Sequence, residues 1–275
     1  MEKTDIPPLS IVGCGAWSPW FENWDAFVAQ VSADELEEHG LKAPAASVIP
    51  GTERRRAPLP VKLAIEASMQ ACAAASMDPT QLPSVFVSGL GDTQLTDYMC
   101  RTLASENKAL SPTRFHNSVH NAAAGYWTIS VGCMRSSNSL AGYEVSMSMA
   151  LLEAAVQANS EQSPILITFY DAPVAPVLQP LLHNRHAFAL ALVVAPATAA
   201  DAADDSKTLG TLRLSSGVGQ SAWPELGLPA PLKECYETNP AARSLLLAEL
   251  LIHKNKDKPV TVPLSNGTSM ALEIS

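Results

Sequence analysis

The chain has few charged residues, and positive ones are in the minority. Only 16% of its 275 residues are Asp, Glu, Lys or Arg, and 18 Lys and Arg stand against 27 Asp and Glu, which gives a net charge of −9. Nucleic acids and anionic membrane surfaces attract basic patches. The composition therefore argues against both as partners. Hydrophobic residues make up 47% of the chain, which is ample for a buried core and leaves room for an interface.

Paired cysteine motifs and long apolar runs are also missing. The five Cys are an odd number, lie far apart and form no Cys-x-x-Cys motif, which favours reduced thiols. No run reaches the roughly 18 apolar residues of a membrane-spanning helix. The opening residues, MEKTDIPPLS, contain no hydrophobic signal core. We therefore expect a cytoplasmic protein that does not insert into a membrane.

Cofactor and metal motifs are incomplete. Gly13-Cys14-Gly15 ends an apolar stretch, but the third Gly of a dinucleotide-binding fingerprint is missing. His116 and His120 have the spacing of paired helical metal ligands, yet no third ligand follows at a matching distance. A structural role is the alternative, in which both imidazoles, with Asn117 and Asn121, satisfy backbone groups in a buried loop. We expect no cofactor and no metal.

Alternating strand and helix patterns predict a layered α/β fold with a mixed sheet and helices on both faces. We expect a domain over residues 1–196 and a short C-terminal extension, residues 197–275, packed on it. The expected strands are residues 9–16, 84–88, 126–131, 164–170, 187–195 and 209–215, with a hairpin around Asn266-Gly267. The main expected helices are residues 60–76, 93–105, 143–158 and 239–254.

The segment that organises the chain is residues 110–158. We predict that residues 126–131 form a strand, that residues 136–142 form a sharp polar turn, and that a buried helix follows. A strand, a tight turn and a helix can present a nucleophile at a helix N-terminus. Three serines, Ser136, Ser137 and Ser139, lie in this turn, but no Gly-x-Ser-x-Gly motif frames them. Hydrogen bonding within the turn is the alternative role for these hydroxyls.

Two motifs in this segment carry a family resemblance. Residues 110–115, LSPTRF, and residues 118–127, SVHNAAAGYW, resemble the β-ketoacyl-synthase-like chain-length factors of aryl polyene and related pathways. This family belongs to the thiolase superfamily, and the resemblance extends weakly over residues 9–196. It implies a fold like the first half of a thiolase-type unit. One half leaves a face to cover, which also argues for a partner.

The resemblance also bears on catalysis. Ketosynthases of this superfamily carry a catalytic Cys in the turn after an Asn-Ala-Ala-Gly segment. Here the matching position falls at or next to Ala141, and the turn contains no Cys. Those enzymes use two further groups, usually His residues of the C-terminal half, to stabilise negative charge. The only late His here is His253, in no matching context.

The function implied by the resemblance is a non-catalytic chain-length factor in polyene or fatty-acid-like biosynthesis. It would pair with an active β-ketoacyl-ACP synthase and shape the acyl tunnel of that enzyme. An acyl carrier protein would be reached through the partner, and a homodimer is possible when the chain is alone. Two alternatives stay open: a self-associating acyl-binding module, and a serine-type acyltransferase or hydrolase. The residues expected at the tunnel or interface are Phe115, His116, Ser118, His120, Asn121, Gly125, Trp127, Ser139 and Ala141.

We place the partner surface at residues 115–141, which are rich in small and aromatic residues and carry few charges. A charge introduced at Ala123 or Ser137 is expected to separate the subunits. Trp127, Met147 and Met149 lie in apolar segments, and we expect all three to be buried and structural.

Overall fold

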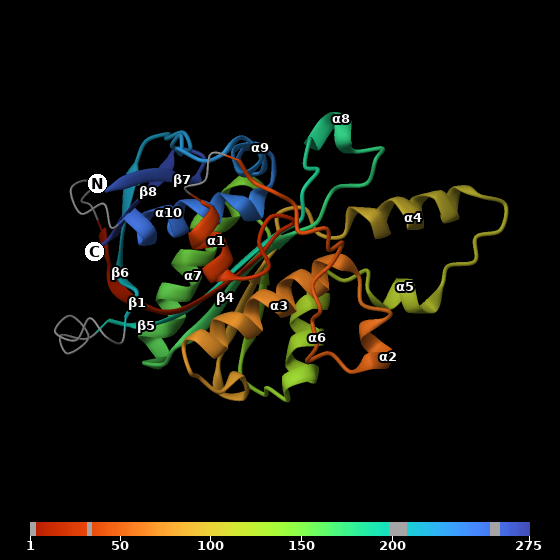
Figure 1. Cartoon of the computed structure of the whole chain (residues 1–275), viewed down its shortest axis with the longest axis horizontal. Coiled ribbons are helices and arrows are strands. Elements are labelled where there is room, and N and C mark those ends of the chain that lie inside the picture. The colour runs from red at the N-terminus through yellow and green to blue at the C-terminus, as the bar shows by residue number, and fades with distance from the viewer. Residues whose placement is uncertain (1–3, 32–34, 198–207, 254–258) are drawn as a thin grey trace.

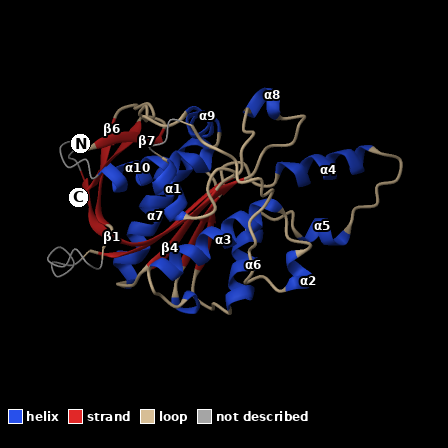
Figure 2. Cartoon of the chain, viewed as in Figure 1, coloured by secondary structure: helices blue, strands red, loops and turns tan. Residues whose placement is uncertain are grey.

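The computed structural model describes residues 4–31, 35–197, 208–253 and 259–275. These residues confirm the predicted mixed sheet with helices on both faces (Figures 1 and 2). Within the described ranges the sheet has eight strands in the order β3-β2-β4-β5-β1-β6-β8-β7, and only β3, β2 and β4 pair in parallel. The strands are β1 Thr4–Trp17, β2 Ser84–Val87, β3 Ser137–Leu140, β4 Ile165–Asp171, β5 Phe188–Pro196, β6 Gly210–Val218, β7 Val260–Ser265 and β8 Thr268–Ile274.

The α-helices alternate with these strands over most of the chain. They are α1 Trp24–Gln30, α2 Gly51–Arg54, α3 Leu59–Ala74, α4 Thr93–Ala104, α5 Pro112–His116, α6 Ala122–Val131, α7 Ser146–Glu161, α8 Gln179–Leu182, α9 Ala230–Thr238 and α10 Leu245–His253. Short 3-10 helices are η1 Pro79–Gln81, η2 Tyr143–Val145 and η4 Pro240–Ser244. None of the described helices is long and apolar enough to cross a membrane.

Helices α3 and α6 cover one face of the sheet. A side chain at Gly13 would collide with the backbone of Ala71, and one at Gly15 with the backbone of Ala67. The Gly-x-Gly of β1 therefore lets α3 lie directly against the strand.

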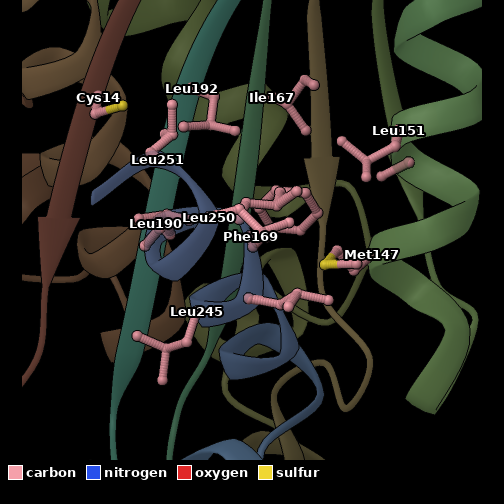
Figure 3. Packing of buried hydrophobic residues seen from close by; sticks show 14 of the residues in the cluster. Cys14, Met147, Leu151, Ile167, Phe169, Leu190, Leu192, Leu245, Leu250 and Leu251 are labelled. Atoms are coloured by element: carbon pink, nitrogen blue, oxygen red, sulfur yellow. The ribbon is translucent and has the colours of Figure 1, made fainter. Parts of the chain in front are cut away.

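The other face is covered by α7 together with η4 and α10 from the C-terminal segment. Figure 3 shows Met147 and Leu151 of α7 and Leu245 and Leu250 of α10 around Phe169 of β4, and all five belong to one buried cluster. Our expectation that a face is left to cover was wrong for this face of the sheet, because η4 and α10 of the C-terminal segment pack on it. Residues 198–207, which adjoin the expected domain boundary, lie outside the described residues.

The predicted strand at residues 126–131 is wrong, since these residues end helix α6. Ala123, Ala124 and Trp127 are buried on the side that faces α3, and this spacing suits one face of a helix. Packing on α3 outweighs the β propensity of the local sequence. The helix ends at Gly132, whose φ of 74° is left-handed, as is common at helix C-termini.

Strand β3 instead lies within residues 136–142, which we expected to form only a turn. It pairs in parallel with β2 alone and is therefore an edge strand. All four of its residues are half-buried. The predicted strand–turn–helix arrangement exists, but its strand is β3 rather than residues 126–131.

Candidate functional site

The carboxyl ends of the parallel strands β2, β3 and β4 bring three loops together. These loops are residues 88–92, residues 141–143 and the long loop that follows Asp171. Gly89 of the first loop lies so close to Pro240 and to the carbonyl oxygen of Tyr143 that a side chain would collide with Pro240. Ligand crevices in parallel sheets form at this edge, so we take it as the candidate site.

The turn after β3 has a strained residue but no evident nucleophile. Tyr143 has a φ of 51°, a left-handed conformation that is costly for a bulky residue and clusters at functional turns. The strained residue is two positions after Ala141, where the resemblance puts the missing Cys. Tyr143 is 46% exposed, and neither Ala141 nor Gly142 carries a reactive group.

The serines near this turn do not form a catalytic arrangement. Ser137 and Ser139 are in β3 rather than in the turn, and Ser137 Oγ accepts a hydrogen bond from Ser84 Oγ at 2.9 Å. The Oγ of Ser139 is buried and has no hydrogen-bond partner among the described residues. Ser146 stabilises the turn instead, because its Oγ accepts from the Gly142 N–H at 3.0 Å and donates to the Tyr143 carbonyl at 2.7 Å.

Asp171 joins the loops from the centre of the site. Its buried carboxylate accepts hydrogen bonds from Ser88 Oγ at 2.6 Å and from the backbone N–H groups of Leu90, Gly89 and Ala241 at 3.1, 3.2 and 3.1 Å. Burial raises the pKa of Asp171 to about 6, although the four hydrogen bonds lower it. The sequence analysis missed this residue, whose only signal was a carboxylate ending an apolar strand.

The predicted motif residues are divided between structural contacts and exposed positions. His120 lies 3.2 Å from the Ser88 carbonyl oxygen through Nε2, and Asn117 donates to the Arg56 carbonyl at 3.4 Å. His116, His120 and Asn121 are all exposed and only Asn117 is buried, so the expectation that all four satisfy groups in a buried loop was wrong for the other three.

The spacing argument for paired His ligands also fails. Helix α5 ends at His116 and α6 begins only at Ala122, so His116 and His120 do not share a helix face. Within the described ranges, no group of three or more His, Cys, Asp or Glu is arranged to hold a metal ion.

Two cavities flank the motif loop, residues 117–123. One, of about 410 Å³, lies between the apolar side of α4, with Leu95, Met99 and Leu103, and the body of the protein. The other, of about 330 Å³, is lined by His116, Asn121, Gly125 and Ile129, among others. Predicted site residues therefore line both cavities, and Asn117 contributes to each of them.

The two helices that contact the edge strand β3, α6 and α7, carry exposed apolar side chains. Ile129 on α6 is 82% exposed and Met134, in the connection to β3, is 95% exposed. On the opposite face of the sheet, Met149 and Val156 of α7 are 40% and 57% exposed. Phe115 and Val119 are also exposed, and Ser118, exposed beside them, donates to the Phe115 carbonyl at 2.8 Å.

Three predictions about burial can be judged from these exposures. Trp127 and Met147 are fully buried, as expected, but Met149 is on the outer side of α7. Ala123 is 1% exposed because it packs inside this chain. A charge at Ala123 would therefore disrupt the fold of the chain itself and is a poor probe of a partner surface.

Similarity to known proteins agrees with this geometry. The family model "Beta-ketoacyl synthase, N-terminal domain" matches residues 26–227. No curated protein sequence matches the chain. Among solved structures, "The ishigamide ketosynthase/chain length factor" is similar with a TM-score of 0.71 and 14% identity, over 98% of this chain and 99% of that chain.

Two further solved structures are similar over nearly their whole length. "Ketosynthase (ApeO) in Complex with its Chain Length Factor (ApeC) from Xenorhabdus doucetiae" has a TM-score of 0.67 and 17% identity, over 96% of this chain and 98% of that chain. A type II acyl-carrier protein in complex with its ketosynthase, AntDE:AntF, has a TM-score of 0.69 and 14% identity, over 98% of this chain and 99% of that chain. At these identities the likeness establishes a shared fold.

Proposed function

Because this chain belongs to the family of β-ketoacyl synthase N-terminal domains, we propose that it is a non-catalytic, chain-length-factor-like subunit. It pairs with an active β-ketoacyl-ACP synthase and shapes the acyl tunnel of that partner. Two of the similar structures are of a ketosynthase together with a chain length factor, which supports this choice within the family.

The observation that carries the proposal is the apolar surroundings of the β3 edge. An unpaired edge strand presents free backbone donors and acceptors and is normally protected. Helix α6 contacts β3 from one face of the sheet and α7 contacts it from the other. Ile129 and Met134, on and just after α6, and Met149 and Val156 of α7 are all substantially exposed. A partner that extends the sheet at β3 would cover the backbone edge and both apolar margins together. Met side chains are enriched in interface cores, and two of these four side chains are Met.

The turn after β3 supports a role without catalysis. A condensing enzyme needs a nucleophile at the strand-to-helix turn and preorganised groups that stabilise developing negative charge. The turn holds Ala141, Gly142 and Tyr143, and Ser146 is engaged in two hydrogen bonds within it. A serine-type hydrolase is not favoured either, because within the described residues no His is hydrogen-bonded to Ser137, Ser139 or Ser146.

Helices α4 and α5 are the part of the chain suited to shape a partner's tunnel. They project from the body of the molecule (Figure 1), and the cavity of about 410 Å³ lies beneath α4. A growing acyl chain is apolar, and so are Leu95, Met99 and Leu103, which line this cavity. We propose a polyene or related acyl chain as the product class, with the acyl carrier protein held mainly by the partner.

The proposed location is the cytoplasm. All five cysteines are free, and four of them are buried, as is usual in a reducing compartment.

Co-expression with a candidate ketosynthase tests the proposal. We expect the two proteins to copurify as a heterodimer, and the pair to condense malonyl units that neither protein condenses alone. Obligate pairs typically bury more than about 2,000 Å², so the complex should survive size-exclusion chromatography with light scattering. A homodimer of the lone chain would be compatible with the proposal. A chain that stays monomeric with every matching ketosynthase would refute it.

A further inference from the structure

A buried arginine beside the strained turn has no carboxylate partner among the residues that the structure describes. Arg243 lies in η4 and is only 9% exposed. Its guanidinium is held between the rings of Trp223 and Tyr236, whose centroids are 5.2 and 4.8 Å from Cζ. The sequence analysis gave no sign of this residue, because Trp223 and Tyr236 come from separate segments.

The hydrogen bonding of Arg243 is incomplete. Its Nη2 donates to the Glu237 carbonyl oxygen at 3.3 Å, and the guanidinium also forms a side-chain hydrogen bond with Tyr236. A guanidinium carries five N–H donors, so further donors remain. No carboxylate of the described residues forms an ion pair with it. A charge removed from water is costly unless it is paired and hydrogen-bonded. The faces of the two aromatic rings offset part of that cost. The N–H donors that remain at the edge of the guanidinium are available to a ligand.

Arg243 is part of the lining of a cavity of about 140 Å³. Arg243 lines it together with Tyr143, His183 and Asn239, while Glu144 and Glu237 add two exposed carboxylates. Stacking holds the guanidinium plane in place, so little side-chain freedom remains to be lost on binding. A planar guanidinium edge matches two coplanar oxygens of a carboxylate.

We propose that this cavity is a binding site for a small monocarboxylate, anchored by Arg243 at the turn where a ketosynthase would hold its nucleophile. The two nearby glutamates set the selectivity. Their negative charges repel a dianion such as phosphate more strongly than a monoanion. The inference stands independently of pairing with a ketosynthase, since every group that it uses belongs to this chain.

Isothermal titration of the purified chain with sodium acetate, at constant ionic strength with chloride as the balancing ion, tests the site. Acetate should bind and inorganic phosphate should bind more weakly. Arg243→Lys keeps the charge but loses the planar fork, so acetate should bind roughly tenfold more weakly or worse, as expected when a charged hydrogen bond is lost. Arg101→Lys is the matched control, because Arg101 is exposed and pairs with Asp97, and its acetate affinity should equal that of the wild type.

A second variant keeps the test decisive if Arg243→Lys does not fold. Glu144 is exposed, so Glu144→Gln should fold normally and bind acetate several-fold more tightly, because a neighbouring negative charge is gone. Absence of acetate binding by the wild type would overturn the proposal. So would phosphate binding as tight as acetate binding, or a Glu144→Gln affinity that does not increase.

Discussion

Ile129 offers the sharpest test of pairing through the β3 edge. It is 82% exposed on the outer side of α6 and lines the cavity of about 330 Å³ beside the motif loop. Burying an Ile side chain fully contributes about 1.5–3 kcal/mol, and an unpaired carboxylate at the same place costs several kcal/mol. Ile129→Asp should therefore weaken the heterodimer by about 4 kcal/mol or more, roughly a thousandfold in Kd.

The assay is copurification of tagged ketosynthase with wild-type or variant chain, followed by light scattering of the eluate. Because Ile129 is exposed in the lone chain, the melting temperature of the Ile129→Asp variant should differ little from that of the wild type. Val218→Asp is the matched control: Val218 is 68% exposed, but β6 is separated from β3 by four strands. If Ile129→Asp pairs as well as the wild type, the partner does not bind at this edge. If both variants lose the partner, the effect is not specific to β3.

Three further predictions test the fold and the proposed lack of activity. Trp127→Ala should destabilise the chain by about 3–5 kcal/mol, because Trp127 is fully buried; a melting temperature within a degree or two of wild type would rule this out. Asp171→Asn replaces one carboxylate oxygen with an NH2 group, which cannot accept a hydrogen bond. If that oxygen is Oδ2, the N–H groups of Gly89 and Ala241 lose their acceptor. Two unsatisfied buried donors cost about 2–6 kcal/mol, so urea unfolding at pH 7.5 should show a clearly lower midpoint, and an unchanged midpoint would contradict the role given to Asp171. The lone chain should not condense malonyl units, and neither Ala141→Cys nor Tyr143→Cys should restore condensation, since a thiol alone stabilises no oxyanion; product above a boiled control from any of these proteins would refute this.

Local sequence was sufficient to predict the helices and strands for which the local residue pattern and the tertiary packing favour the same structure. The apolar runs at residues 164–170 and 187–195 are the central strands β4 and β5, buried on both faces. The helix expected over residues 143–158 is present as η2 and α7, because Ala, Leu and Met favour a helix wherever it packs. The motifs in residues 110–127 led to a family resemblance that the family match confirms at the level of the β-ketoacyl synthases. Burial of Trp127 followed from the same apolar segment.

Tertiary structure decided the points where local preference and packing disagree. Residues 126–131 have β propensity, yet α6 forms because Ala123, Ala124 and Trp127 can pack on α3 only from a helix. Composition did not predict which side chains are exposed either. Met147 and Met149 are the same residue type, two positions apart on α7, but Met147 faces the core and Met149 faces outward.

The contacts between distant segments were likewise decided only by the fold. Asp171 accepts hydrogen bonds from residues 70 or more positions away in both directions, at Leu90 and Ala241. Arg243 acquires its environment from Trp223, Tyr236 and the turn at Tyr143. A short window of sequence contains no information about such partners, because hydrogen bonds and ring contacts depend on distance in space. The charge environment of the candidate site therefore exists only in the folded chain.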